Sequence, residues 1–213
     1  MGLILARLIS SAYRRYDFLS AFVIGPQGVG KTSYAMLVAY EVYGDWDRVL
    51  ENLHFDPREA LPRLREALRS GERVPLLIFD DAGMHLSKYL VSSSREGFHL
   101  ARLLNALINL ARTLTAGIIY TSPDMDVLKE LRKKAWVVAE PLAPHGRGKP
   151  YRVARLYRKR ILASGKVAIQ KLGLDEYDLR AVPGDVRKQY EEKRRRAMEP
   201  LLEELEAVWS QAS

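Results

Sequence analysis

The sequence contains no cysteine, and this absence excludes two classes of site. Neither a disulfide bond nor a zinc site built on thiolates can form. The four histidines, at positions 54, 85, 99 and 145, are scattered, and no two of them have the spacing of a metal-binding pair. Asn and Gln are also scarce, which indicates a thermophilic source, although a GC-rich genome produces the same bias.

Long hydrophobic runs are absent as well. No apolar stretch reaches the roughly 18 residues that a membrane-spanning helix needs. The most apolar candidate, at the N-terminus, carries Arg7, Arg14 and Arg15 and lacks the small-residue cleavage pattern of a signal peptide. We therefore expect a cytoplasmic protein without membrane contact. The 213 residues, 47% of them hydrophobic, suffice for one globular domain with a small appendage.

Short apolar runs alternate with helical stretches over the first two thirds of the chain. Strands are expected at 21–24, 49–55, 76–79, 117–121 and 136–139, and most of these runs are continuously apolar, as in strands buried on both faces. Helices are expected at 3–16, 31–43, 57–69 after an N-cap at Asp56, 96–115 and 124–134. This order predicts an α/β fold in which helices sandwich a parallel sheet.

The composition changes near residue 142, so we divide the chain into a core of residues 1–142 and an extension of residues 143–213. A loop rich in Pro and Gly over 141–150 leads to two strands, 151–162 and 166–172, which predict an antiparallel hairpin. Residues 183–209 predict one charged helix with a break expected at Pro200. We expect this helix to be solvated; pairing with a neighbouring subunit or packing on the hairpin are the alternatives.

A phosphate-binding motif stands between the first predicted strand and the next helix. The segment Gly25-Pro26-Gln27-Gly28-Val29-Gly30-Lys31-Thr32 matches G-x-x-x-x-G-K-[ST] in full. Its glycines let backbone N–H groups wrap a polyphosphate, and the helix N-terminus adds positive charge. We expect these residues and Ser33 to bind ATP, with Lys31 on the β- and γ-phosphates and the Thr32 hydroxyl on Mg²⁺. No N-K-x-D motif is present, which favours ATP over GTP, and a glycine turn without a ligand is the alternative.

A second motif, Leu76-Leu77-Ile78-Phe79-Asp80-Asp81, ends a buried strand in two carboxylates, where an acidic group is costly unless it meets a cation. With both motifs, residues 20–140 resemble the P-loop ATPases that have an additional strand between the phosphate-loop strand and the acidic strand. That division includes AAA+, RecA-like and FtsK/HerA-like ATPases, and the chain resembles its small archaeal plasmid or virus members. The resemblance implies that Asp80 holds Mg²⁺ through water and that Asp81 polarises the attacking water. Most members have Glu at the second position, and Asp81 could instead cap the following loop.

The same resemblance implies two further catalytic positions. A polar residue ending the intervening strand would contact the γ-phosphate, and Thr121 or Ser122 would do so unless both merely begin the turn into Pro123. An arginine at the end of the following helix, Arg132, would reach the nucleotide of a neighbouring subunit, with Arg112 as a second candidate. Cations favoured by the helix C-terminus are the alternative. An arginine acting between subunits predicts a homo-oligomer, for example a hexameric ring.

The net charge of +8 is unevenly spread, because residues 147–171 hold nine Lys or Arg and no Asp or Glu. Cations interleaved with Tyr151 and Tyr157 favour phosphate contact and base stacking. We therefore expect DNA to contact five residues of the hairpin: Arg152, Arg155, Arg158, Lys159 and Arg160. Strand alternation puts cations on both faces, so neither is expected to be a core face. A solvated sheet edge is the alternative.

Together these features predict a motor-like or remodelling ATPase that acts on DNA during replication, transfer or packaging of a mobile element. Two rival functions share the phosphate-binding motif. A small-molecule or nucleotide kinase would need an acceptor pocket, for which no motif is visible, and a non-catalytic switch would use ATP to control assembly. Stimulation of hydrolysis by DNA would separate the motor from both rivals.

Overall fold

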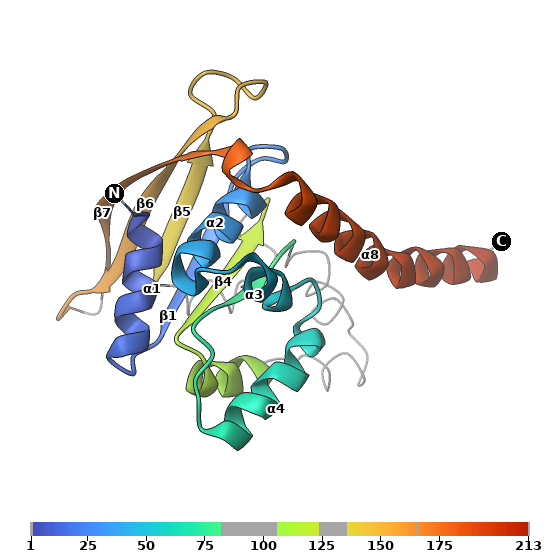
Figure 1. The fold of residues 1–213 in the computed structure, drawn as a ribbon, viewed down its shortest axis with the longest axis horizontal. Coiled ribbons are helices and arrows are strands. Elements are labelled where there is room, and N and C mark those ends of the chain that lie inside the picture. The colour runs from blue at the N-terminus through green and yellow to red at the C-terminus, as the bar shows by residue number, and fades with distance from the viewer. Residues whose placement is uncertain (1, 82–105, 124–135, 165, 213) are drawn as a thin grey trace.

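The computed structural model describes residues 2–81, 106–123, 136–164 and 166–212 (Figure 1). Its helices are α1 (Ile4–Arg14), α2 (Lys31–Tyr43), α3 (Trp46–Glu51), α4 (Leu61–Ser70) and α8 (Gly184–Ala212), with 3₁₀ turns η1 (Pro57–Ala60) and η3 (Leu179–Ala181). Residues 106–114 are also helical. The strands are β1 (Leu19–Ile24), β2 (Leu53–His54), β3 (Leu77–Phe79), β4 (Gly117–Ser122), β5 (Val137–Leu142), β6 (Tyr151–Ile161) and β7 (Val167–Asp178).

The seven strands form one sheet in the order β2-β3-β4-β1-β5-β6-β7. Strands β2, β3, β4, β1 and β5 run parallel, whereas β6 and β7 join the β5 edge as an antiparallel hairpin. Strand β4 lies between β1 and β3, so one strand separates the phosphate-loop strand from the acidic strand. The predicted α/β fold class is confirmed, and the hairpin extends the same sheet. The division at residue 142 stays a prediction.

Helices cover both faces of the sheet. Successive residues of the central strands point to opposite sides and so contribute to both layers. Ala21, Val23 and Ile119 pack on one side with α1, α2, α3 and the first part of α8. Phe22, Tyr120 and their neighbours pack on the other side with α4 and the helical residues 106–114. Within the described ranges, no helix combines the length and the apolar character that a membrane span requires.

The prediction of a strand over 49–55 is wrong in its first half. Val49 belongs to helix α3, whose N-cap Asp45 accepts a hydrogen bond from the backbone N of Asp47 at 2.8 Å. Only the two residues of β2 pair with β3. Asp56 caps the next turn as predicted, but the helix over 57–69 is divided into η1 and α4. The predicted helix over 124–134 and the first part of that over 96–115 lie outside the described residues.

One carboxylate connects the N-terminal helix to the hairpin. Asp175 on β7 is 3% exposed and accepts hydrogen bonds from the backbone N of Ile4 at 2.7 Å and of Leu5 at 3.4 Å. The Tyr34 hydroxyl of α2 donates to the same carboxylate at 2.6 Å. Because the first N–H groups of a helix have no partner within the helix, Asp175 satisfies donors that would otherwise be buried without one. The hairpin is therefore joined to the core by more than its strand pairing.

Candidate nucleotide-binding site

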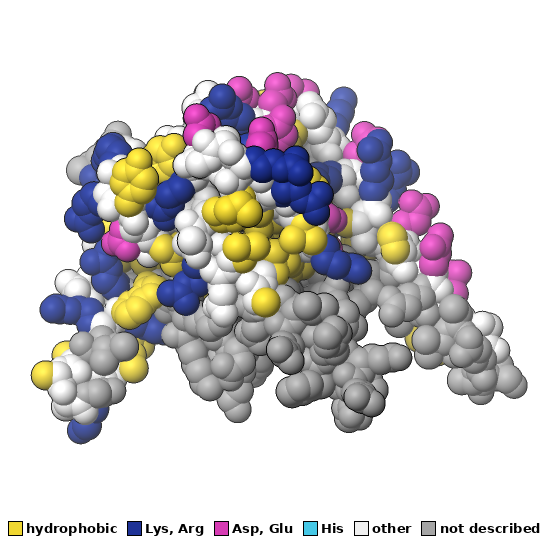
Figure 2. All heavy atoms as spheres, turned by 90° about the horizontal axis from the view of Figure 1, so that it is seen from below, with side chains coloured by type: hydrophobic (Ala, Val, Ile, Leu, Met, Phe, Trp, Pro, Cys, Tyr) yellow, Lys and Arg dark blue, Asp and Glu magenta, His cyan; other side chains and the backbone are white. Residues whose placement is uncertain are grey.

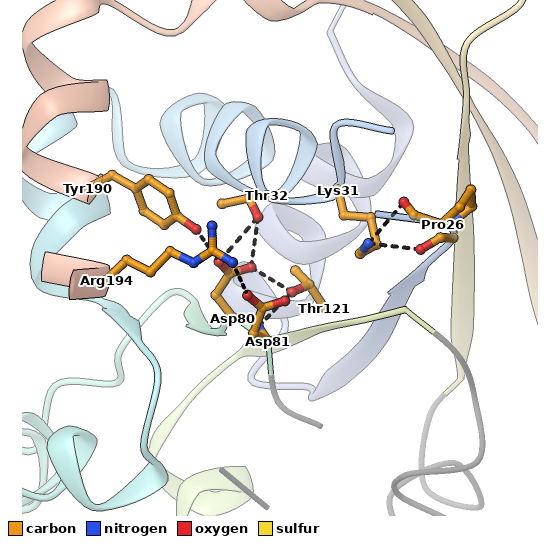
Figure 3. A network of polar contacts seen from close by, with 9 residues as sticks. Pro26, Lys31, Thr32, Asp80, Asp81, Thr121, Tyr190 and Arg194 are labelled. Carbon is orange, nitrogen blue, oxygen red and sulfur yellow. Dashed lines mark hydrogen bonds and ion pairs between the residues drawn. The ribbon is translucent and has the colours of Figure 1, made fainter. Parts of the chain in front are cut away.

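The phosphate loop follows β1 at the edge of the sheet where the parallel strands end, and the ends of β3 and β4 meet it there (Figure 3). Gly30, the N-cap of α2, has φ 98°. A Cβ at this position would lie 2.8 Å from Leu179 Cδ2 of η3. Gly30 is therefore required both by its left-handed backbone and by the close approach of the C-terminal segment. The loop conformation depends on residues far along the chain.

Asp80 is the centre of the polar network in Figure 3 and is 0% exposed. Its carboxylate accepts hydrogen bonds from the hydroxyls of Thr32 at 3.0 and 3.1 Å, Thr121 at 2.5 Å and Tyr190 at 2.7 Å. Burial raises the pKa of Asp80 above its ordinary value, and the three hydroxyl donors oppose that shift. Four segments of the chain are thus joined at one buried carboxylate.

The Thr32 hydroxyl and the Asp80 carboxylate have the chemistry of a Mg²⁺ site. Hydroxyl and carboxylate oxygens are the ligands that Mg²⁺ prefers, and these two lie in hydrogen-bond contact at the phosphate-loop end of the sheet. The residues therefore fit the metal, which Thr32 would hold directly and Asp80 through water. A bound Mg²⁺ would neutralise charge on the phosphates.

Lys31 faces its own loop. The residue is 8% exposed, and its ammonium group donates to the carbonyl oxygens of Gly25 at 2.8 Å and Pro26 at 3.2 Å. Burial lowers the pKa of Lys31, while the charges of Asp81 and Asp80 raise it. A cation held by two neutral carbonyls gains more from a phosphate, so this ammonium group is suited to turn toward bound nucleotide.

Asp81 has φ 46°, a left-handed backbone conformation that is uncommon outside glycine. Its backbone N donates to Thr121 Oγ1 at 2.9 Å, and its carboxylate accepts from the Arg194 guanidinium at 2.9 Å. Thr121 therefore orders both acidic residues. Among the described residues, the neighbouring Ser122 hydroxyl is buried and has no hydrogen-bond partner. That Thr121 contacts the γ-phosphate stays a prediction.

Sequence reasoning missed the contribution of α8, which was expected to be a solvated helix. Arg187, Tyr190, Glu191 and Arg194 line a cavity of about 510 Å³ together with the phosphate loop and Asp81. This volume lies in the range of ~300–1,000 Å³ that is typical of ligand pockets. A signal was present, because Val186, Tyr190 and Arg194 are spaced four residues apart on one face of a helix.

Arg152 was predicted to contact nucleic acid, and the structure contradicts this. The side chain is 1% exposed. Its guanidinium donates to the Val29 carbonyl at 2.9 Å, to the Arg147 and Tyr151 carbonyls at 2.9 Å each, and to the Lys149 carbonyl. Four of the five N–H donors of this guanidinium are thus bound to carbonyls, and the side chain is buried rather than presented at the surface. Arg152 instead fixes the phosphate loop to the loop before β6.

The expectation that neither hairpin face is a core face is also wrong. Arg152, Ala154 and Leu156 are buried on one face of β6, and the pairing with β7 skips Leu172 opposite Leu156 and Tyr157. The four other predicted contacts, Arg155, Arg158, Lys159 and Arg160, are partly or fully exposed and lie away from the nucleotide cavity. Arg132 lies outside the described residues.

No established family model matches the chain. Among solved structures, it is similar to the RadB recombinase, with 19% identity, a TM-score of 0.38 and coverage of 73% of this chain and 87% of that one. It is also similar to the flagellar accessory protein FlaH from Methanocaldococcus jannaschii, with 13% identity, a TM-score of 0.37 and coverage of 78% and 94%.

Two viral proteins match in sequence. Protein ORF286 of Acidianus two-tailed virus is 31% identical over 123 residues, which are 58% of this chain and 42% of that protein. The uncharacterized protein B-251 of Sulfolobus spindle-shape virus 1 is 34% identical over 216 aligned residues, 94% of this chain and 83% of B-251. At this identity and coverage, the chain belongs to the same family as B-251, and it has the fold of a P-loop ATPase.

Proposed function

We propose that this chain is a Mg²⁺-dependent ATPase that acts on DNA as an oligomer. The contact between the Thr32 hydroxyl and the buried Asp80 carboxylate carries the first part of the proposal. It joins the phosphate-binding motif to the acidic strand across an intervening strand. A glycine turn without a ligand gives no reason for a fully buried carboxylate at this position.

Each residue of the site has a separate role in the transfer of the phosphoryl group to water. The backbone of residues 25–33 and the Lys31 ammonium would bind the phosphates, while Thr32 and Asp80 would hold Mg²⁺. Asp81 would orient the attacking water once its carboxylate is released from Arg194. The released guanidinium could then stabilise charge on the transferring phosphoryl group from within the same chain.

A single substitution tests the ATPase assignment. Lys31→Ala should abolish ATP hydrolysis, because the phosphates lose the ammonium group. It should leave the fold intact, because that group donates to two carbonyls of the phosphate loop itself. Lys188→Ala, which removes an exposed cation from α8, is the matched control and should hydrolyse ATP normally. Wild-type turnover in Lys31→Ala, with an unchanged circular dichroism spectrum, would contradict the site assignment.

The action on DNA is supported by the partly or fully exposed cations of the hairpin that remain after Arg152 is removed from the set: Arg155, Arg158, Lys159 and Arg160. ATP turnover should rise when DNA is added. Phosphate transfer to a small acceptor, with no effect of DNA, would favour the kinase instead. ATP binding without turnover in either condition would favour the assembly switch.

Oligomerisation is proposed because Arg132 would contact the nucleotide bound by a neighbouring subunit. The oligomer would be a ring, for example a hexamer. Arg132→Ala subunits should bind ATP but not hydrolyse it. Mixing them with Lys31→Ala subunits should restore activity, because an intact arginine then meets an intact phosphate loop. An active monomer in light scattering would exclude this arrangement and leave Arg194 as the arginine that acts within one chain.

A further inference from the structure

A groove of about 570 Å³ lies at the end of the sheet opposite the nucleotide cavity. It is lined by Phe18 and Leu19 before and at the start of β1, and by Trp136 and Val137 at the start of β5. The phosphate loop begins after Ile24, at the other end of the six-residue strand β1. At about 3.3 Å per residue, roughly 20 Å separate the groove from the nucleotide.

Five cationic side chains and one carboxylate surround this groove. Arg15 follows α1, Arg112 belongs to the helical residues 106–114, and Arg158, Lys159 and Arg160 come from β6. The carboxylate, Asp17, lies 3.7 Å from Arg15, and both side chains are more than 60% exposed, so this ion pair contributes little. Figure 2 views the molecule from this end and shows Lys and Arg gathered among hydrophobic side chains on the side of the hairpin. Three distant segments thus bring positive charge to one place.

Two aromatic rings lie between these cations. Trp136 is 43% exposed, and its backbone is held on both sides, since its N donates to the Ser20 carbonyl at 3.1 Å and its carbonyl accepts from Lys159 N at 2.9 Å. The Arg112 guanidinium lies 5.4 Å from the centre of the Phe18 ring. The partly exposed indole on a fixed backbone offers ring surface on which a base can stack.

We infer that this groove binds single-stranded nucleic acid, with phosphates on the arginines and a base stacked on Trp136. The inference rests on the proposed action on DNA and specifies the form of the nucleic acid and the place where it binds. Phosphates complement the excess of positive charge. Only unpaired bases expose a face on which an indole can stack, because the bases of a duplex already stack on one another. Of the predicted contacts, Arg158, Lys159 and Arg160 belong to this site, whereas Arg155 does not line it.

Tryptophan fluorescence tests the stacking directly. In the absence of ATP, a 20-nucleotide oligothymidylate should quench the tryptophan emission of the wild type and of Trp46→Phe. In the wild type the Trp46 ring stacks on Tyr40 with centroids 4.4 Å apart, away from the groove. The quenching should be lost in Trp136→Phe, and Trp136→Ala should weaken binding about tenfold. Undiminished quenching in Trp136→Phe, with normal thermal unfolding, would overturn the inference.

Salt dependence tests the cations. The double variant Arg158→Ala with Arg160→Ala should weaken oligothymidylate binding and flatten the slope of log affinity against log salt by about 0.7 for each phosphate that is no longer neutralised. Lys188→Ala removes an exposed positive charge on α8 and should leave the slope unchanged. The site would be overturned if Lys188→Ala flattened the salt slope as much per charge removed. It would also be overturned if a duplex of the same length bound more tightly than oligothymidylate, or if polyglutamate competed with oligothymidylate equally well. ATP hydrolysis without oligonucleotide is measured separately, so failure of the groove and failure of the ATPase are distinguishable.

Discussion

Tyr190→Phe removes one hydroxyl from the buried carboxylate that joins α8 to the nucleotide site. In the wild type this hydroxyl donates to Asp80 at 2.7 Å, and Asp80 is 0% exposed. Tyr190 also lines the nucleotide cavity, but Asp80 itself is fully buried, so its carboxylate loses a donor inside the protein. The substitution should therefore destabilise the fold although it adds no atom and opens almost no cavity.

The expected magnitude follows from the charge of the acceptor. Hydrogen bonds to ionised groups contribute about 1.5–3 kcal/mol each, against about 0.5–1.5 kcal/mol for neutral pairs. A loss of about 2 kcal/mol would lower Tm by roughly 4–8 °C in a chain of this length. Tyr177→Phe is the matched control, because Tyr177 and Tyr190 are both 7% exposed, but the Tyr177 hydroxyl donates to the neutral Gly30 carbonyl at 3.3 Å.

The effect should depend on pH. Burial raises the folded-state pKa of Asp80 above its ordinary value of 3.8. As pH rises from that ordinary value through the folded-state pKa, ionisation of Asp80 in the fold therefore lowers the free energy of unfolding. The Tyr190 hydroxyl offsets part of this loss in the wild type. The difference in free energy of unfolding between wild type and Tyr190→Phe should therefore be largest above the folded-state pKa of Asp80. It should shrink as pH falls through that pKa, where the carboxyl becomes neutral.

Urea unfolding at several pH values measures these differences, and an unchanged m-value would show that the two variants expose the same surface on unfolding. The Tyr177→Phe difference should be smaller and independent of pH over the same window. Equal losses in the two variants, or a Tyr190→Phe loss that does not change with pH, would refute an ionised Asp80 held by Tyr190.

Three further substitutions test other contacts. Asp81→Asn should retain binding of a fluorescent ATP analogue but slow turnover at least about a hundredfold, as expected when a water-orienting carboxylate is removed; normal turnover would place the base elsewhere. Arg194→Ala should release Asp81 and still reduce turnover by about a thousandfold, if the guanidinium acts on the phosphoryl group within the same chain; faster turnover would show that it only blocks Asp81. Asp175→Asn should lower the free energy of unfolding by about 2–3 kcal/mol in urea, because three donors lose a charged acceptor, and wild-type stability would contradict that role.

The parallel sheet and the phosphate loop were predictable because their signals are local. The run that forms β1 and the motif from Gly25 to Thr32 are contiguous, and the run that forms β3 ends directly in Asp80 and Asp81. A strand, its turn and the following helix N-terminus are determined by neighbouring residues. The error over 49–55 shows the limit of this approach, since apolar residues in a short run serve a helix as readily as a strand.

Long-range polar pairing was not predictable. A cation in a strand gives no local sign of whether it faces solvent or a set of carbonyls, so Arg152 was assigned to DNA although its guanidinium contacts Val29, 123 residues earlier. Likewise, the spacing of Val186, Tyr190 and Arg194 indicates a helix face but not what that face covers. Charged residues are usually solvated, which made the solvated helix the natural expectation.

The sequence by itself therefore determined the α/β fold, the phosphate-binding motif and the two acidic residues, because each depends on a short stretch of chain. Only the tertiary structure decided which residues complete the site. Tyr190 meets Asp80 across 110 positions and Arg194 meets Asp81 across 113. Those contacts exist because a buried carboxylate must find donors wherever the packed chain brings them, and distance along the sequence carries no information about that meeting.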